Sequence, residues 1–84
     1  MRELSIIRTP FSEFYKDVKT GKEVLLDYGE RVVVLLNEDD SVYRVKIPLH
    51  ASERCARFIA LSILELAVQK FWEAKNPIHN ELEM

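Results

Sequence analysis

The sequence predicts a single small α+β domain in which an antiparallel sheet is covered by two helices, in the order β-α-β-β-α. Three observations indicate this fold. Short β-branched runs alternate with polar turns, two segments have helical apolar spacing, and the chain has only 84 residues. A domain of this size buries only about 60–65% of the surface of its unfolded chain. The lone Cys55 excludes an internal disulfide and a zinc site built from several cysteines. Association with another chain is therefore the expected source of further stability.

The N-terminal quarter predicts a strand followed by a short helix. Residues 4–8 are rich in Ile and end at a Thr-Pro pair, which is typical of a strand. Thr9 then suits the N-cap of a helix and Pro10 its first helical position, with Gly21 just beyond its end. The helical stripe at i, i+3, i+4 and i+7 consists of Phe11, Phe14, Tyr15 and Val18.

The middle of the chain predicts a β-hairpin. Residues 31–36 contain a run that is apolar on both faces, which suits a strand covered on both sides or covered on one side by a partner. Residues 37–40 form a polar turn, and residues 41–47 alternate as a half-exposed strand does before Pro48 ends it. Residues 24–26 predict one further short strand.

The last helix carries the clearest physical signal for a partner. Ser52 is its predicted N-cap, and the helix should end near residue 74 or 75, before Pro77, with residues 76–84 as a short acidic tail. One stripe, consisting of Cys55, Ile59, Ile63 and Leu66, is predicted to cover the sheet. Further apolar residues widen the apolar arc well beyond the roughly 100° of a helix that packs on one side, which favours a partner over cover from within the chain. The residues expected at that protein interface are Phe58, Leu61, Leu64, Glu65, Val68 and Trp72.

Catalytic and metal-binding patterns are thin, so we expect neither an enzyme nor a cofactor. His50 and His79 have no neighbours at metal-ligand spacing, and the carboxylates of residues 38–40 fall on a turn. Cys55 near a helix N-terminus could be reactive, but a buried position facing the sheet is favoured. Neither a signal-peptide pattern nor a membrane-spanning run is present, which predicts a cytoplasmic protein.

The charge balance argues against a nucleic-acid binder driven by charge alone. Twelve Lys and Arg residues stand against fourteen Asp and Glu residues, a net charge of −2. Arg31, Arg44 and Lys46 could share an exposed sheet face and contact phosphates, and a solvated strand face is the favoured alternative. A homodimeric nucleic-acid-binding module is therefore the second hypothesis for the function.

The element order and the last helix resemble the small dimerising subunit of the KEOPS complex, which makes the threonylcarbamoyladenosine modification of tRNA. That family carries an Arg followed five residues later by a Ser in its last helix, as Arg57 and Ser62 are spaced here, with Leu64 following. Leu61 stands where the family has Asn, and Phe58 where it has a small residue. These departures resemble a divergent paralogue, of the kind that archaea carry beside the standard subunit.

The resemblance implies an architectural role. In that family two copies, or two paralogues, pair with each other, and their helices bundle with helices of the catalytic ASKHA-type subunit. The implied function is a non-catalytic dimerisation and scaffold subunit that pairs through its sheet and its long last helix. Its implied partners are a second copy or paralogue, the catalytic subunit and, within the complex, tRNA.

Overall fold

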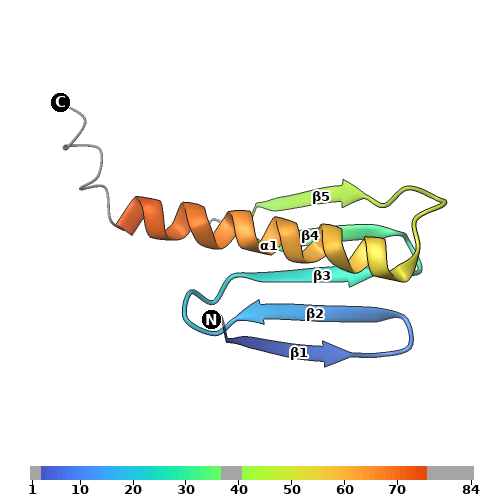
Figure 1. Cartoon of the computed structure of the whole chain (residues 1–84), viewed down its shortest axis with the longest axis horizontal. Coiled ribbons are helices and arrows are strands. Elements are labelled where there is room, and N and C mark those ends of the chain that lie inside the picture. Colours follow the sequence, from blue (N-terminus) through green and yellow to red (C-terminus); the bar gives the residue numbers. More distant parts are fainter. Residues whose placement is uncertain (1–2, 37–40, 76–84) are drawn as a thin grey trace.

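In the part of the chain that the structure describes, five strands form one antiparallel sheet in which each strand pairs with its neighbour along the chain, and one helix follows (Figure 1). The computed structural model describes residues 3–36 and 41–75. The elements are β1 (Leu4–Arg8), β2 (Ser12–Asp17), β3 (Glu23–Asp27), β4 (Val32–Leu36), β5 (Val42–Lys46) and α1 (Glu53–Lys75). The α+β class and the antiparallel sheet are confirmed. The predicted order β-α-β-β-α is wrong: among the described residues the order is β-β-β-β-β-α, and one helix, not two, covers the sheet.

The segment predicted as the first helix is strand β2. Thr9 is therefore not a helix N-cap as predicted, although its Oγ1 accepts hydrogen bonds from the backbone N–H groups of Phe11 and Ser12 at 3.2 and 3.0 Å. Gly21 has the expected left-handed φ of 78°. These contacts close the turns at the two ends of β2 and cap no helix.

Pairing on both sides of β2 explains why the helical stripe does not decide its structure. Phe14 lies opposite Ile7 of β1 and Leu25 of β3, so the strand is paired along both edges. Side chains along β2 alternate between the two faces of the sheet. Glu13, Tyr15 and Asp17 share one face, and all three are buried. In a helix with the predicted apolar stripe, Glu13 and Asp17 would lie on the opposite face, in solvent. Tertiary pairing therefore overrides a helical spacing that was itself genuine.

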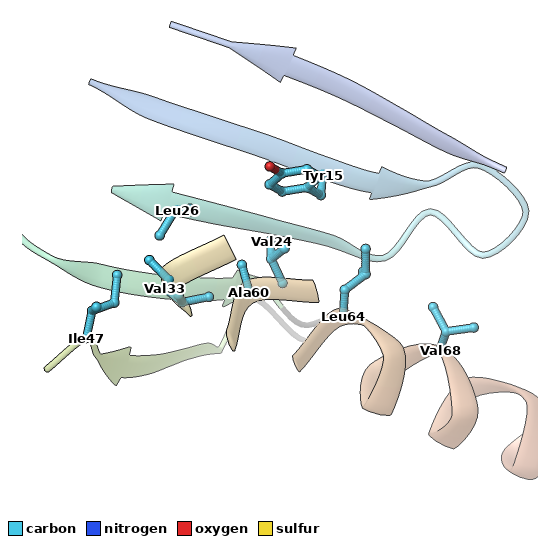
Figure 2. Close-up of a cluster of buried hydrophobic side chains, with 9 residues drawn as sticks. Tyr15, Val24, Leu26, Val33, Ile47, Ala60, Leu64 and Val68 are labelled. Atoms are coloured by element: carbon cyan, nitrogen blue, oxygen red, sulfur yellow. The ribbon is translucent and has the colours of Figure 1, made fainter. Parts of the chain in front are cut away.

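The core lies between one face of the sheet and α1, which packs on β2, β3 and β4. Figure 2 shows side chains of the sheet directed towards the helix, and the fully buried members of this cluster are Tyr15, Val24, Leu26, Val33, Ala60, Leu64 and Val68. Helix α1 has 23 residues and extends past the end of the sheet in Figure 1. A helix of that length measures about 34 Å, whereas a five-residue strand measures about 17 Å.

The beginning of α1 is as predicted, but its sheet-facing stripe is not. The backbone N–H of Cys55 donates to Ser52 Oγ at 3.2 Å, which is the expected N-cap bond. The buried residues of the helix are Ala56, Ala60, Leu64 and Val68. The predicted stripe is therefore wrong in phase: Cys55 and Leu66 are exposed, and Ile59 and Ile63 are half-buried. Ala56 and Ala60 let the N-terminal part of the helix lie close to the sheet, and a prediction that weights large side chains overlooks them.

Candidate protein interface

The six residues predicted for the protein interface are spaced three or four positions apart along α1, with the pair Leu64 and Glu65 adjacent. They differ in burial, from fully buried to exposed. Leu64 and Val68 are buried against the chain's own sheet, at 2% and 1% exposure, so their side chains are used within the monomer. Leu61 and Glu65 are half-buried. Phe58 and Trp72 are 71% and 43% exposed and are the two members of the set that could contact another molecule directly.

Helix α1 keeps apolar side chains in solvent after its core contacts are made. Besides Phe58 and Trp72, Leu66 is 57% exposed, and these three residues are called the helix surface below. A hollow of about 610 Å³ lies beside it, where Leu66 and Phe71 of α1 approach Leu35 and Tyr43 of the sheet. The Nζ atoms of Lys22 and Lys75 lie 5.7 and 5.5 Å from the centroid of the Phe71 ring.

A buried ion pair fixes the N-terminal half of α1 to the sheet. Arg57 Nη2 donates to Glu13 Oε2 at 2.7 Å and Arg57 Nε donates to Glu13 Oε1 at 2.9 Å, a bidentate arrangement. The Glu13 side chain is 6% exposed and the Arg57 side chain 33%. Arg8 Nε adds a longer contact of 3.6 Å to Glu13 Oε2. The family motif includes Arg57, but no sequence signal predicts its partner, because Glu13 lies outside the apolar stripe of the helix that the sequence predicts for residues 10–20.

Two tyrosines complete this cluster. The hydroxyl of Tyr15 donates to Glu13 Oε1 and accepts from Arg57 Nε at 3.0 Å, and Arg57 Nη2 lies 3.5 Å from the hydroxyl of Tyr28. Hydrogen bonding to Arg57 is the main reason why the pKa of Glu13 is lowered from 4.5 to about 2, and burial opposes it. The pKa of Arg57 is raised by the same bonds. Burial first, and then the Glu13 carboxylate, raise the pKa values of Tyr15 and Tyr28. The positive charge of Arg57 compensates the negative charge of the buried Glu13, and the cluster holds α1 against the sheet.

The face of the sheet opposite α1 is called the open face below. The strand register aligns Ile7, Phe14, Leu25 and Val34 side by side across four strands, and Arg44 of β5 continues this row. Leu36 and Val42 lie beside each other in the next row, at 55% and 46% exposure. Strand β4 is thus apolar on both faces, as the sequence indicated, although α1 covers only one of them. An antiparallel sheet with one face in water usually alternates apolar and polar residues.

The three basic residues proposed for nucleic-acid contact do not gather at one place. Arg44 and Lys46 are exposed and share the open face. Arg31 Nη2 instead donates to the backbone carbonyl groups of Pro48, Leu49 and Ala51 at 2.6, 3.2 and 3.3 Å. Arg31 therefore holds the connection that leads into α1. The expectation that all three share one exposed face is wrong.

The remaining candidates give no catalytic constellation within residues 3–36 and 41–75. Cys55 is exposed and not buried as predicted, because it lies on the outer side of α1. His50 is exposed, and the described residues contain no group of three His, Cys, Asp or Glu that could hold a metal ion. His79 and the carboxylates at 38–40 lie outside the described residues, as does the tail 76–84. Within the described part of the chain, α1 is not apolar enough over its length to cross a membrane.

Comparison with known proteins adds no relative. No protein-family model, curated protein or solved structure matches the chain.

Proposed function

We propose that the chain is a non-catalytic interaction subunit that pairs through its sheet and through α1. The observation that carries this proposal is the helix surface. Phe58, Leu66 and Trp72 remain exposed although α1 already covers its own sheet. Aromatic residues of this kind are the usual anchors of protein interfaces, since they bury a large area with few rotatable bonds.

The KEOPS complex is the assembly that we propose for this subunit. Its support is the spacing of Arg57, Ser62 and Leu64 on the long last helix. The topology gives no support, because the chain has five strands before its helix and lacks the helix after the first strand. The pair of Arg57 with Glu13 also accounts for the conspicuous arginine within this chain alone. In this proposal the partner is the catalytic ASKHA-type subunit, the location is the cytoplasm, and tRNA is contacted through the assembled complex.

The nucleic-acid alternative has less support. Of its three residues only Arg44 and Lys46 are free of the backbone contacts that occupy Arg31, and the open face that they share also carries the carboxylates of Glu23 and Asp27. A phosphate backbone would meet mixed charge there.

The proposal is tested by size-exclusion chromatography with light scattering on the chain mixed with the catalytic KEOPS subunit. We expect a defined complex that is lost with Trp72→Glu and retained with Gln69→Glu, which adds the same charge at an exposed position of the same helix. Separate elution of the two proteins would refute the KEOPS assignment. A complex that still forms with Trp72→Glu and with Phe58→Glu would refute the proposal that the helix surface binds the partner.

A further inference from the structure

We propose that the hollow between α1 and β5 binds a single-chain organic anion, namely a carboxylate on an unbranched apolar chain of the fatty-acid type. This inference goes beyond the proposed function, because it concerns a small ligand and not a protein partner. Leu66 belongs both to the helix surface and to the wall of the hollow, so the two sites adjoin each other.

The position of α1 on the sheet leaves this hollow open. Within the described residues, α1 packs on β2, β3 and β4 but not on β5, which lies to one side of it in Figure 1. Leu35 of β4 pairs with Val24 of β3 and with Tyr43 of β5, so Tyr43 shares the face of the sheet on which Val24 is buried. Tyr43 nevertheless remains 55% exposed. The hollow above it has about 610 Å³, which is within the range of about 300–1,000 Å³ that is usual for small-molecule sites.

The wall that α1 contributes to the hollow is long, and its N-terminal part is apolar. The lining residues of α1 begin at Ile63 and continue to Ala74 before Lys75, and the distance from Ile63 to Ala74 corresponds to about 16 Å along the helix axis. Ile63, Leu66 and Ala67 have no side-chain group that forms hydrogen bonds. The part of a ligand that lies against them must therefore be apolar, and an unbranched chain can follow the wall along the helix.

Three lysines make the other end of the hollow cationic, namely Lys22, Lys70 and Lys75. The Nζ atoms of Lys22 and Lys75 lie 5.7 and 5.5 Å from the centroid of the Phe71 ring, so two distant segments of the chain bring their ammonium groups to one place. Among the described residues that line the hollow there is no Asp or Glu. A carboxylate bound at this end would accept charge-assisted hydrogen bonds from the ammonium groups and reduce the repulsion between them.

The separation of apolar and cationic parts favours a long-chain carboxylate over the other anions that lysines bind. Apart from the three lysines, Tyr43 is the one residue with a polar side-chain atom among the described residues that line the hollow. A nucleotide or a sugar phosphate would place several hydroxyl and ring nitrogen atoms against Ile63 and Leu66, where they would lose their hydrogen bonds to water. An inorganic phosphate would leave the apolar part of the hollow unused. A long-chain carboxylate uses both parts.

The first test is isothermal titration calorimetry of the full chain with dodecanoate, below the concentration at which dodecanoate forms micelles. We expect one molecule to bind per chain, with an affinity that rises about two- to fourfold for each CH₂ group added between hexanoate and dodecanoate. Dodecyltrimethylammonium has the same apolar chain on a cationic head group and should bind at least tenfold more weakly. Absence of dodecanoate binding, or equal binding of the two amphiphiles, would overturn the proposal.

The second test addresses the head group of the ligand. The double variant Lys70→Gln/Lys75→Gln should weaken dodecanoate binding at least tenfold. The matched control, Lys16→Gln/Lys46→Gln, removes the same charge from the open face and should change the affinity less than twofold. All four lysines are exposed, so neither double variant alters the core. Equal losses in the two double variants would mean that the anion responds to the net charge of the chain and not to the hollow, which would overturn the proposal.

The third test addresses the apolar chain of the ligand. Leu66→Gln should weaken the binding of dodecanoate by a larger factor than the binding of hexanoate, because the longer chain has more contact with the wall. Phe58→Gln is the matched control on the same helix: Phe58 is 71% exposed and does not line the hollow. An equal effect of the two variants would overturn the placement of the chain. Binding to phosphatidylglycerol vesicles without binding of dodecanoate monomers would assign the lysines to a membrane surface and would also overturn the proposal.

Discussion

At the scale of single residues, the contact between Glu13 and Arg57 links the second strand to the first turns of α1. Both carboxylate oxygens are bonded to the guanidinium, and the tyrosine hydroxyls fill the remaining directions. A buried carboxylate is tolerated in the middle of the sheet because these partners replace the water that it loses.

This contact predicts a specific loss of stability in acid. The pKa of Glu13 is about 2 in the folded chain and is expected near its ordinary 4.5 when unfolded, so the unfolded state takes up its proton first. The stabilisation is complete above pH 4.5 and is lost as the pH falls from about 4.5 to about 2. Urea unfolding of the wild type and of Glu13→Gln at several pH values measures it. The difference between their free energies of unfolding should shrink across this window, and a difference that does not depend on pH would contradict the assignment.

At the scale of elements, sequence patterns were informative about strands and about where the helix begins. Strand β1 and the N-cap at Ser52 follow from local residues and lie where they were predicted. Strand β2 was misassigned because its apolar residues have helical spacing, whereas the face that it buries carries the carboxylates Glu13 and Asp17, which no local pattern marks as buried. Only the strands that pair on each side of β2 decide its structure. The phase of α1 was missed for a related reason. When most sides of a helix are apolar, the sheet-facing side is chosen by close approach, and here Ala56 and Ala60 permit it.

The N-cap of α1 should contribute measurably. We expect Ser52→Ala to lower the free energy of unfolding by about 1 kcal/mol, because the N–H of Cys55 loses its acceptor. Ser52→Asp keeps an acceptor at the same place and should retain most of the stability. Urea denaturation of both variants measures the difference, and equal loss in the two would show that the cap bond is not the cause.

The close approach of α1 to the sheet gives a second prediction. Ala60 is fully buried, so Ala60→Leu forces added volume between the helix and the sheet and should cost about 1–3 kcal/mol. The same substitution at Ala74, which is exposed, should change the free energy of unfolding by less than about 0.5 kcal/mol. Thermal and urea unfolding of the two variants provide the comparison. Equal effects would mean that the interior is loosely packed at Ala60.

At the scale of the whole molecule, one helix on one face of a five-stranded sheet leaves two kinds of apolar surface in water. These are the helix surface and the open face, and they lie on opposite sides of the domain. The sequence indicated such a surplus through the breadth of the last helix and the run in β4. The sequence could not indicate where these two surfaces lie, because it predicts a second helix on the sheet where the chain instead forms strand β2.

The excess length of α1 over the strands has a consequence for its motions. Val68 is the last residue of α1 that belongs to the buried core. No residue in the helical turns after Val68 is fully buried against the sheet. Their backbone hydrogen bonds can open without separating the helix from the sheet, as opening free energies generally differ between regions of one protein. Amide hydrogens beyond Val68 should therefore exchange with deuterium through local fraying of the helix. Those near Ala60 should exchange only when the whole domain unfolds. Binding of a partner to this end of the helix would be registered as slower exchange at these few amides, with the rest of the chain unchanged.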